Sequence, residues 1–265
     1  MVETLERKLG IKLTQNGKEK LRDLEKEFLS EFWSFVPCRA GTTPIEKRVI
    51  CVPAVASKLA CLIEGNGNSI PAVTLDRIYV RNADWCLEVT RKTDPKTGKV
   101  EITERAGSEP LEKQIEVMKD YLKKNRVVLC DVGAFEGGTL LTVCMELERR
   151  GVSVEMICLG ICSGDAYRKL KRERKVATVY MFNLYEWVEL RDLLGIDGRY
   201  VGMRDGKRLF IPYWETLSQW ASISREVEKD AANLCKEYNR KLMKILQEEG
   251  CDVEKIGIPV KYGGK

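Results

Sequence analysis

The feature that most constrains this chain is a strand, loop, helix and strand pattern between residues 127 and 159. Residues 127–130 are a continuous apolar run, 131–138 are rich in glycine, 139–150 have helical character, and 152–159 are apolar again. This spacing predicts a βαβ unit, in which the two strands are parallel members of one sheet. Such connections are nearly always right-handed, and ligands bind at the carboxyl ends of the strands. The chain is therefore expected to be an α/β protein with a ligand site near residues 131–138.

Further elements are expected on both sides of this unit. Before it, the pattern predicts strand pieces at 48–53, 70–73 and 78–80, a helix at 56–63, a hairpin of 85–91 with 99–103 around a turn at 94–98, and a helix at 111–124. After it, the pattern predicts a strand at 178–182, a helix at 184–194, a hairpin of 199–203 with 208–212 that turns at Asp205-Gly206, a helix at 224–249 and a loose tail at 251–265.

The chain length favours one main domain with a small addition, since single hydrophobic cores grow to roughly 250 residues before they divide. Apolar residues recur at helical spacing near the N-terminus, from Leu21 to Phe32, and Asn16 with Glu19 is expected to cap that helix. We expect an N-terminal helical appendage at 1–38, an α/β domain at 39–216, and a C-terminal helix with its tail at 217–265.

Composition limits the chemistry that is open to this chain. It has 10 cysteines, which we interpret as reduced, and no histidine, so serine–histidine and cysteine–histidine catalysis and the usual zinc sites are excluded. The net charge of +5 is mild and dispersed, so nucleic acid is not expected as a partner. Its apolar runs are too short for a membrane span and the N-terminus is charged, so we expect a cytoplasmic protein.

The glycine-rich segment Asp131-Val-Gly-Ala-Phe-Glu-Gly-Gly-Thr-Leu140 has the residues of a phosphate-binding loop. The first turn of a helix presents unpaired backbone N–H groups and a positive dipole end, which attract phosphate. Glycine allows close approach of the backbone, and a carboxylate at the end of the strand can accept hydrogen bonds from sugar hydroxyls. The segment therefore predicts a site for a nucleotide or sugar phosphate.

Here the chain resembles the type I phosphoribosyltransferases, which use phosphoribosyl pyrophosphate (PRPP). Their PRPP loop has an apolar strand, two acidic residues, a spacer and Thr-Gly-x-Thr before a helix. Asp131 stands at the first acidic position, and Gly137 and Thr139 match the glycine and the last threonine. Val132 stands at the second acidic position and Glu136 at the first threonine.

Three other segments strengthen the resemblance. Residues 52–58 resemble the strand-end loop that holds pyrophosphate, and Arg91-Lys92 with Lys96 and Gly98 resemble the flexible catalytic arm of orotate-type enzymes. Residues 210–215 are similar to a Phe-Pro-Trp-Glu stretch of some purine enzymes. The resemblance covers roughly residues 40–216.

The resemblance implies a Rossmann-like parallel sheet with a small hood, a homodimer, and transfer of phosphoribose to or from a nucleobase with pyrophosphate as co-product. It implies Mg²⁺ that is held mainly by PRPP, with no direct metal ligand from the protein. The implied catalytic residues are Asp131, Arg91, Lys92 and Lys96; the PRPP and phosphate ligands are Ala54, Val55, Ala56, Ser57, Lys58, Asp131, Glu136, Gly137, Gly138, Thr139 and Leu140; the base-binding residues are Phe210, Tyr213 and Trp214.

Two alternative hypotheses stay open from the sequence. The 131–138 segment also fits the Asp-x-Gly-x-Gly-x-Gly loop with which Rossmann-type methyltransferases bind S-adenosylmethionine, with Phe135 at the middle glycine. That class has an acidic residue at the end of the next strand, whereas the nearest acid here is Asp165. The second alternative is a non-catalytic sensor of PRPP or nucleotides on the same fold, which Val132 and Glu136 favour.

Overall fold

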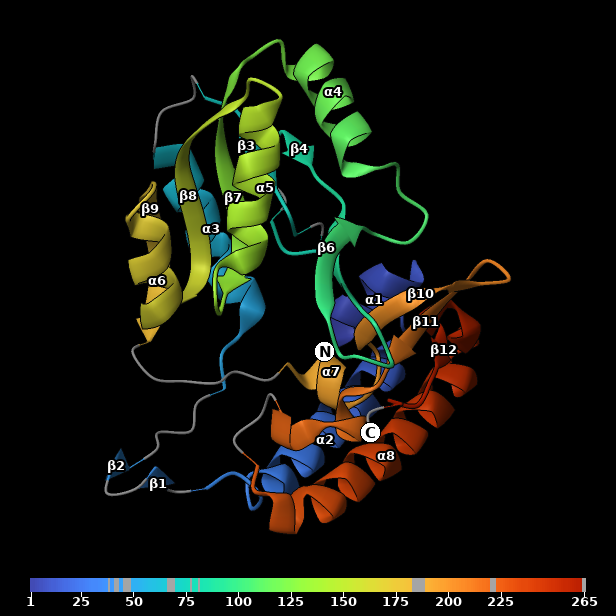
Figure 1. Ribbon diagram of the computed structural model, residues 1–265. Coiled ribbons are helices and arrows are strands. Elements are labelled where there is room, and N and C mark those ends of the chain that lie inside the picture. Colours follow the sequence, from blue (N-terminus) through green and yellow to red (C-terminus); the bar gives the residue numbers. More distant parts are fainter. Residues whose placement is uncertain are drawn as a thin grey trace. The chain divides into compact units, whose positions relative to one another are not determined.

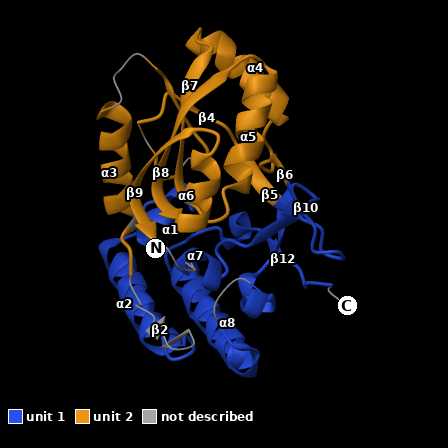
Figure 2. Cartoon of the chain, turned by 60° about the vertical axis from the view of Figure 1, so that its left-hand side comes forward, with its two compact units in different colours: residues 1–48, 92–101, 186–265 blue, residues 49–91, 102–185 orange. Residues whose placement is uncertain are grey.

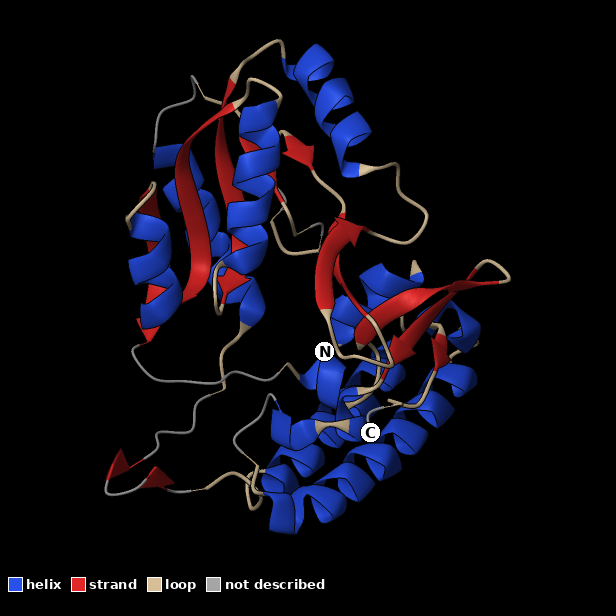
Figure 3. Cartoon of the chain, in the orientation of Figure 1, coloured by secondary structure: helices blue, strands red, loops and turns tan. Residues whose placement is uncertain are grey.

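The computed structural model (Figure 1) describes residues 1–37, 39–40, 43–44, 49–65, 70–76, 78–80, 82–182, 189–219 and 223–263. The chain divides into two compact units (Figure 2). Unit 1 contains residues 1–48, 92–101 and 186–265, and unit 2 contains residues 49–91 and 102–185. Each unit has helices and strands of its own (Figure 3).

Unit 2 is built on a parallel sheet of five strands in the order β4-β3-β7-β8-β9. The strands are β3 (Ala72–Thr74), β4 (Trp85–Cys86), β7 (Arg126–Ala134), β8 (Ser153–Ser163) and β9 (Lys175–Phe182). All four neighbouring pairs are parallel. Numbered along the chain, this order is 2-1-3-4-5, the order of flavodoxin-like doubly wound sheets.

Helices cover both faces of this sheet (Figure 1). On one face α3 (Val52–Gly65) contributes Leu59 to a core that also contains Val128, Cys130 and Cys158. On the other face lie α4 (Leu111–Leu122), α5 (Gly138–Arg149) and α6 (Gly164–Lys171), whose apolar side chains share a core with Leu129. Burial on both faces explains why β7 and β8 have continuous apolar runs. Unit 2 is therefore a Rossmann-like α/β fold.

Unit 1 has its own hydrophobic core, which the two ends of the chain form together. The helices are α1 (Val2–Leu9), α2 (Gln15–Phe32), the short α7 (Leu190–Leu193) and α8 (Arg225–Glu248). Phe28 of α2 lies with its ring centroid 5.2 Å from Phe32 and 5.3 Å from Tyr238 of α8. Both phenylalanines and Tyr238 are at most 1% exposed. The terminal helices therefore bury their apolar faces against each other and share one core.

A second sheet has the strand order β12-β11-β10-β5-β6. Its strands are β5 (Val89–Thr93), β6 (Val100–Glu104), β10 (Arg199–Arg204), β11 (Lys207–Ile211) and β12 (Ile258–Pro259). The predicted hairpin of 199–203 with 208–212 is confirmed, since β10 and β11 turn at Asp205 and Gly206, which both have positive φ. The other predicted hairpin is confirmed in part: β5 is followed by a turn closed by Asp94 and Lys99, but Trp85 and Cys86 form β4 of the parallel sheet. The remaining described elements are the two-residue strands β1 (Arg39–Ala40) and β2 (Thr43–Pro44) and the 3₁₀ turns η1 (Tyr213–Glu215), η2 (Leu217–Gln219) and η3 (Val253–Ile256).

Several local predictions need correction. The described part of 48–53 holds no strand, because α3 already begins at Val52 and accommodates Pro53 in its first turn. Residues 78–79 form a turn, and α2 is capped by Thr14, which accepts a hydrogen bond from the Gly17 N–H, and not by Asn16. A helix was predicted at 184–194. Residues 184–188 lie outside the described residues, and the rest of the segment contains the short helix α7.

The C-terminal tail is also more ordered than predicted, as far as it is described. Its strand β12 pairs in parallel with β11. Further along, the Gly263 N–H donates to the Pro95 carbonyl over 3.1 Å. The tail therefore belongs to the second sheet and to the tip of the β5–β6 hairpin.

Candidate functional site

The candidate loop lies at the carboxyl edge of the parallel sheet, but it is shorter than the sequence predicted. Strand β7 continues to Ala134, with Asp131 paired to Leu159 and Ala134 to Cys162 of β8. On the other side, β3 ends at Thr74, and the Leu75 N–H donates to the Cys130 carbonyl over 3.0 Å. Residues 131–134 are thus part of β7 and pair with β8, which also extends to Ser163. The connection from β7 to α5 is therefore only residues 135–137.

The sheet reverses its winding direction between β3 and β7. From β3 the chain goes outward to β4 on one side, whereas β7, β8 and β9 follow on the other. Ligands of open α/β sheets bind at this topological switch point, outside the carboxyl ends of the strands. Asp131 lies there on β7, next to the segment that follows β3.

The start of α5 is suited to binding an anion. Its N-cap is Gly137, with φ of 75°, and no side chain caps the first turn. A Cβ on Gly137 would lie 3.2 Å from Leu170 Cγ, whereas a Cβ on Gly138 would meet nothing within 4 Å. Gly137 is therefore required by its conformation and packing, while Gly138 faces open space. Glu136 is exposed, Thr139 is partly buried and Leu140 lies in the core.

The next helix along the same edge begins differently. The Ser163 hydroxyl accepts a hydrogen bond from the Ala166 N–H at 2.7 Å and donates to the Phe135 carbonyl at 2.6 Å. Ser163 is 1% exposed. The start of α6 is thus satisfied by its own N-cap side chain, as is usual for helices that bind no ligand there.

Two aspartates at the switch point are close enough for their charges to interact. The Asp76 Oδ1 atom accepts the N–H of Ile78 at 2.9 Å and that of Tyr79 at 2.5 Å. The Asp131 Oδ1 atom accepts the Val132 N–H at 2.7 Å. Burial, followed by repulsion from Asp76, raises the pKa of the Asp131 carboxyl to about 7, although the backbone N–H of Val132 and the charge of Arg105 act in the opposite direction.

Asp76 and Arg105 were not among the predicted site residues. A signal for Asp76 was present in the sequence, because an acid that closely follows a parallel strand lies at the same edge as Asp131. Arg105 had no such signal, since it follows the second strand of a hairpin and is brought here only by the fold. Its Nη2 atom donates to the Leu75 carbonyl over 3.2 Å.

The residues predicted to hold pyrophosphate lie on a helix and not in a strand-end loop. Ala54, Val55, Ala56, Ser57 and Lys58 form the first turns of α3. Val55 is 1% exposed and packs on Gly160 of β8, where an added Cβ would lie 2.6 Å from Val55 Cγ1.

Lys58 is the cationic member of this group, and it is exposed. Its Nζ donates to the Tyr180 hydroxyl over 2.8 Å and lies 4.9 Å from the centre of that ring. The face of α3 that packs on the sheet is therefore structural, whereas Ala54, Ser57 and Lys58 are exposed.

The predicted arm is a hairpin whose tip belongs to unit 1. Arg91 is exposed on β5, and Lys92 pairs in register with Tyr200 of β10 and lies 3.7 Å from Glu101 as an ion pair. Lys96 sits in the turn, where its backbone N–H donates to Asp94 Oδ1 over 2.7 Å. Sheet pairing at Lys92 and the tail contact at Pro95 hold this tip in its unit.

The predicted base-binding aromatics pack within unit 1. Phe210 is 2% exposed, and its ring lies 5.3 Å from the Arg208 guanidinium. Trp214 packs against Gly195, where an added Cβ would lie 2.4 Å from the indole ring. Tyr213 is partly buried in the same 3₁₀ turn. Phe210 and Trp214 therefore have packing roles in unit 1.

A partly buried group of charges in unit 1 forms ion pairs within the unit. Lys8 of α1 donates to the Ile196 carbonyl and lies 3.5 Å from Asp197, and Arg208 lies 2.5 Å from the same carboxylate. Burial lowers the pKa of Lys8 to about 8, while the Lys8 and Arg208 cations hold the pKa of Asp197 below its usual range. These contacts join α1 to β11.

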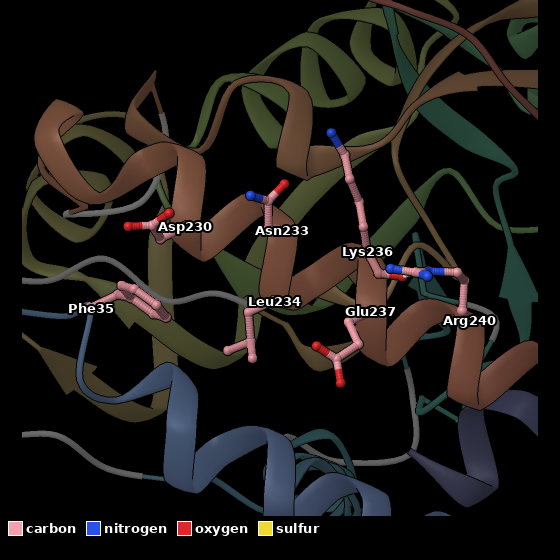
Figure 4. Close-up of a pocket in the computed structure, with 7 residues that line it drawn as sticks. All are labelled: Phe35, Asp230, Asn233, Leu234, Lys236, Glu237 and Arg240. Carbon is pink, nitrogen blue, oxygen red and sulfur yellow. Dashed lines mark hydrogen bonds between the residues drawn. The ribbon is translucent and has the colours of Figure 1, made fainter.

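Unit 1 also has an open pocket of about 370 Å³ beside α8 (Figure 4). Its lining is Phe35, Asp230, Asn233, Leu234, Lys236, Glu237 and Arg240. The lining mixes acidic and basic side chains, and none of the predicted site residues is among them.

The described residues contain no group of three or more histidine, cysteine, aspartate or glutamate side chains that could hold a metal ion. Of the helices in that part of the chain, none has both the length and the apolar composition needed to cross a membrane.

Comparison with protein-family models gives no match, and neither does comparison with curated proteins. Among solved structures, this chain is similar to the crystal structure of TT1426 from Thermus thermophilus, with 14% sequence identity and a TM-score of 0.36. That match covers 72% of this chain and 99% of TT1426. The Rossmann-like assignment follows from the strand order and helix layers of unit 2.

Proposed function

We propose that unit 2 binds PRPP or a related nucleotide at the junction of β7 and α5, in the manner of type I phosphoribosyltransferases. The observation that carries the proposal is the start of α5, where Gly137 leaves the first turn without a side-chain cap. Asp131 lies a few residues before Gly137 on β7, the strand that leads into α5, at the switch point of the sheet. An anion site beside a carboxylate suits a ligand with a phosphate at one end and hydroxyl groups at the other.

In this proposal each group has a defined role. The backbone N–H groups of Gly138, Thr139 and Leu140 bind the 5′-phosphate, because they are the orphan donors of the first helical turn. Asp131 accepts hydrogen bonds from the ribose hydroxyls. Glu136 is exposed and turns its charge to solvent, so it leaves the amides accessible.

Mg²⁺ enters with PRPP in this proposal. Mg²⁺ prefers oxygen ligands, among them water and phosphate oxygens, so it would be held mainly by PRPP with no direct ligand from the protein. Mg²⁺ would supply charge neutralisation of the pyrophosphate.

Transfer of phosphoribose to or from a nucleobase is the further hypothesis. It requires that Arg91, Lys92 and Lys96 stabilise the pyrophosphate charge, and it carries the expectation of a homodimer. Released pyrophosphate, measured with a panel of bases, tests this step separately from binding. A protein that binds PRPP but releases no pyrophosphate would fit the alternative hypothesis of a non-catalytic sensor.

The methyltransferase alternative has less support from the described residues. The strand after α5 ends at Ser163, which caps α6 and has no carboxylate for ribose hydroxyls. The nearest acid, Asp165, is exposed and pairs with Arg168.

The test is calorimetric titration with PRPP and Mg²⁺, beside S-adenosylmethionine, using the wild type, Asp131→Ala and the matched variant Asp165→Ala. We expect PRPP to bind the wild type and Asp165→Ala, and to bind Asp131→Ala at least tenfold more weakly, since a lost charged hydrogen bond is worth about 1.5–3 kcal/mol. Binding of S-adenosylmethionine without PRPP binding would replace the proposal by the methyltransferase.

A further inference from the structure

Strand β9 forms one edge of the parallel sheet of unit 2 (Figure 1). In the described residues its only strand partner is β8, and α3 and α6 pack beside it on the two faces of the sheet. The outward N–H and C=O groups of an edge strand can pair with another chain, and monomeric proteins discourage this with short strands, charges, proline or bulges. An edge without these features indicates a strand that pairs with a partner.

The other edges of the two five-stranded sheets have such features. Strand β4, at the opposite edge of the parallel sheet, is only two residues long, and so is β12, which contains Pro259. Strand β6 has five residues, of which Glu101 and Glu104 are charged. Each of these three edges is therefore protected against pairing with another chain.

Strand β9 lacks this protection after its first residue. It has eight residues, and the seven that follow Lys175 include no charge, proline or glycine. Its pairing with β8 has no register shift, so no bulge bends it away from a partner. Three of its residues are β-branched, which favours a strand, and Met181 is 49% exposed. Among the described strands that form the edges of these two sheets, β9 is therefore the long and uncharged one.

The charges beside β9 favour one orientation of a partner copy. Arg172 and Lys175 are exposed at the start of the strand, whereas Tyr180, Met181 and Phe182 at its end are uncharged. Parallel pairing of two copies would bring their basic starts together, and like charges on neighbouring strands destabilise pairing. Antiparallel pairing separates the two starts by the strand length, about 26 Å for eight residues. The charges therefore favour antiparallel pairing about a two-fold axis, which closes the assembly as a dimer.

A second copy also presents side chains that suit those of β9. Opposite residues of antiparallel strands lie on the same face of the sheet, so the two-fold axis passes beside a single residue of the strand. With Val179 at the axis, near the middle of β9, Tyr180 lies opposite Thr178 of the copy and Phe182 opposite Val176. Pairs of aromatic and β-branched side chains stabilise antiparallel sheets. A second copy is therefore a matching occupant of this edge.

We propose that β9 pairs with β9 of a second copy of this chain, antiparallel and about a two-fold axis, so that the two parallel sheets join into one continuous sheet. This inference does not depend on the proposed ligand, and it gives the expected homodimer a defined interface. The interface satisfies the outward backbone groups of β9 and covers Met181.

The experiment measures self-association of the full chain by analytical ultracentrifugation over a range of protein concentrations. The wild type is compared with Val179→Lys, which places two ammonium groups opposite each other at the axis, and with Met181→Lys, whose site is exposed in the monomer. Met145→Lys is the matched control, because Met145 of α5 is 50% exposed in the same unit. Circular dichroism checks that each variant is folded. Hydrogen exchange of the wild type, at concentrations above and below its dissociation constant, reports protection of the β9 amides.

We expect a wild-type dimer in which the β9 amides exchange more slowly at the higher concentration. The dissociation constant should rise about 100-fold in Val179→Lys and about tenfold in Met181→Lys, and stay within about twofold in Met145→Lys, because like charges at an interface cost several kcal/mol. If Val179→Lys does not fold, Met181→Lys decides. A wild type that is monomeric at every concentration overturns the inference. A dimer that folded Met181→Lys does not weaken, or whose β9 amides exchange equally at both concentrations, also overturns it, since the copies would then meet at another surface.

Discussion

Helices α5 and α6 start at the same edge of the same sheet, after neighbouring parallel strands. The N–H groups of their first turns are nevertheless satisfied in different ways. In α6, Ser163 satisfies a first-turn N–H and also bonds to Phe135. In α5, the N-cap is Gly137 and no side chain caps the turn. Since orphan N–H groups need a partner, the amides of α5 must be satisfied by solvent or by a ligand.

The difference teaches where to look for function in a doubly wound sheet. A helix that supplies its own cap is complete without a ligand, whereas one that begins at glycine leaves its dipole and amides accessible. Asp131 belongs to the strand that leads into α5, and it carries a pKa of about 7 because of burial and Asp76. The uncapped start of α5 and the Asp131 carboxyl, whose pKa is raised, therefore lie on one segment at the carboxyl edge of the sheet.

The largest expected effect comes from placing a charge at the uncapped start. Gly138→Asp should weaken PRPP binding about 100-fold or more, because two repelling anions then compete for the same amides, while an acid in the first turn suits the helix dipole and keeps the fold stable. Calorimetry and thermal unfolding measure the two effects. Gly138→Ala is the control, since a Cβ there meets nothing within 4 Å; unchanged affinity in Gly138→Asp would remove α5 from the site.

Gly137 should be needed for folding rather than for recognition. Gly137→Ala should lower the free energy of unfolding by about 2–3 kcal/mol, because φ is 75° and the new Cβ approaches Leu170. Gly151→Ala is the matched variant, with the same φ of 75° and no atom within 4 Å of the Cβ. Urea unfolding of both separates backbone strain from crowding, and equal losses would show that the Leu170 contact contributes nothing.

The carboxyl of Asp131 should make stability depend on pH. The pKa of Asp131 in the folded state, about 7, lies above the ordinary value of 3.8, so the folded state stays protonated at a higher pH than the unfolded state. The stability that Asp131 contributes therefore falls as pH rises from about 4 to 7 and then levels off. Asp131→Asn lacks this slope and should gain up to about 4 kcal/mol relative to wild type by pH 8. Urea titrations at pH 4.5, 6 and 8 measure the difference, and parallel curves would contradict the raised pKa.

The smallest expected effect concerns the capped helix. Ser163→Ala should lower the free energy of unfolding by about 1–2 kcal/mol, the value of a lost N-cap. PRPP affinity should stay within about twofold, because α6 has no part in the proposed site. A large loss of affinity in folded Ser163→Ala would mean that the Phe135 contact positions the loop and that the two helix starts are not independent.

Local patterns were enough to predict the β7, α5 and β8 segment of unit 2 and the β10–β11 hairpin of unit 1. The apolar run of β7, the glycines before α5 and the Asp205-Gly206 turn each encode their geometry within a few residues, and the structure contains the corresponding strand, helix start and hairpin. The extension of β7 to Ala134 was missed because it depends on pairing with β8, whose own length the local pattern also understated.

Long-range packing explains the remaining differences. Phe28 and Tyr238 meet although they are far apart in sequence, so the sequence pattern showed two helices but not a common core. Arg105 reaches the site through the base of the hairpin, which has no local signature, whereas Asp76 had a signal in its position just after a strand.

The central claim is that a sugar phosphate binds at the start of α5. Amide NMR of the protein during titration with PRPP and Mg²⁺ tests it most directly. The account predicts that the backbone signals of Gly138 and Thr139 shift with a saturating dependence on ligand, while that of Ala166, already bonded to Ser163, stays in place. Shifts at Ala166 without shifts at Gly138, or no shifts at either helix start, would contradict it.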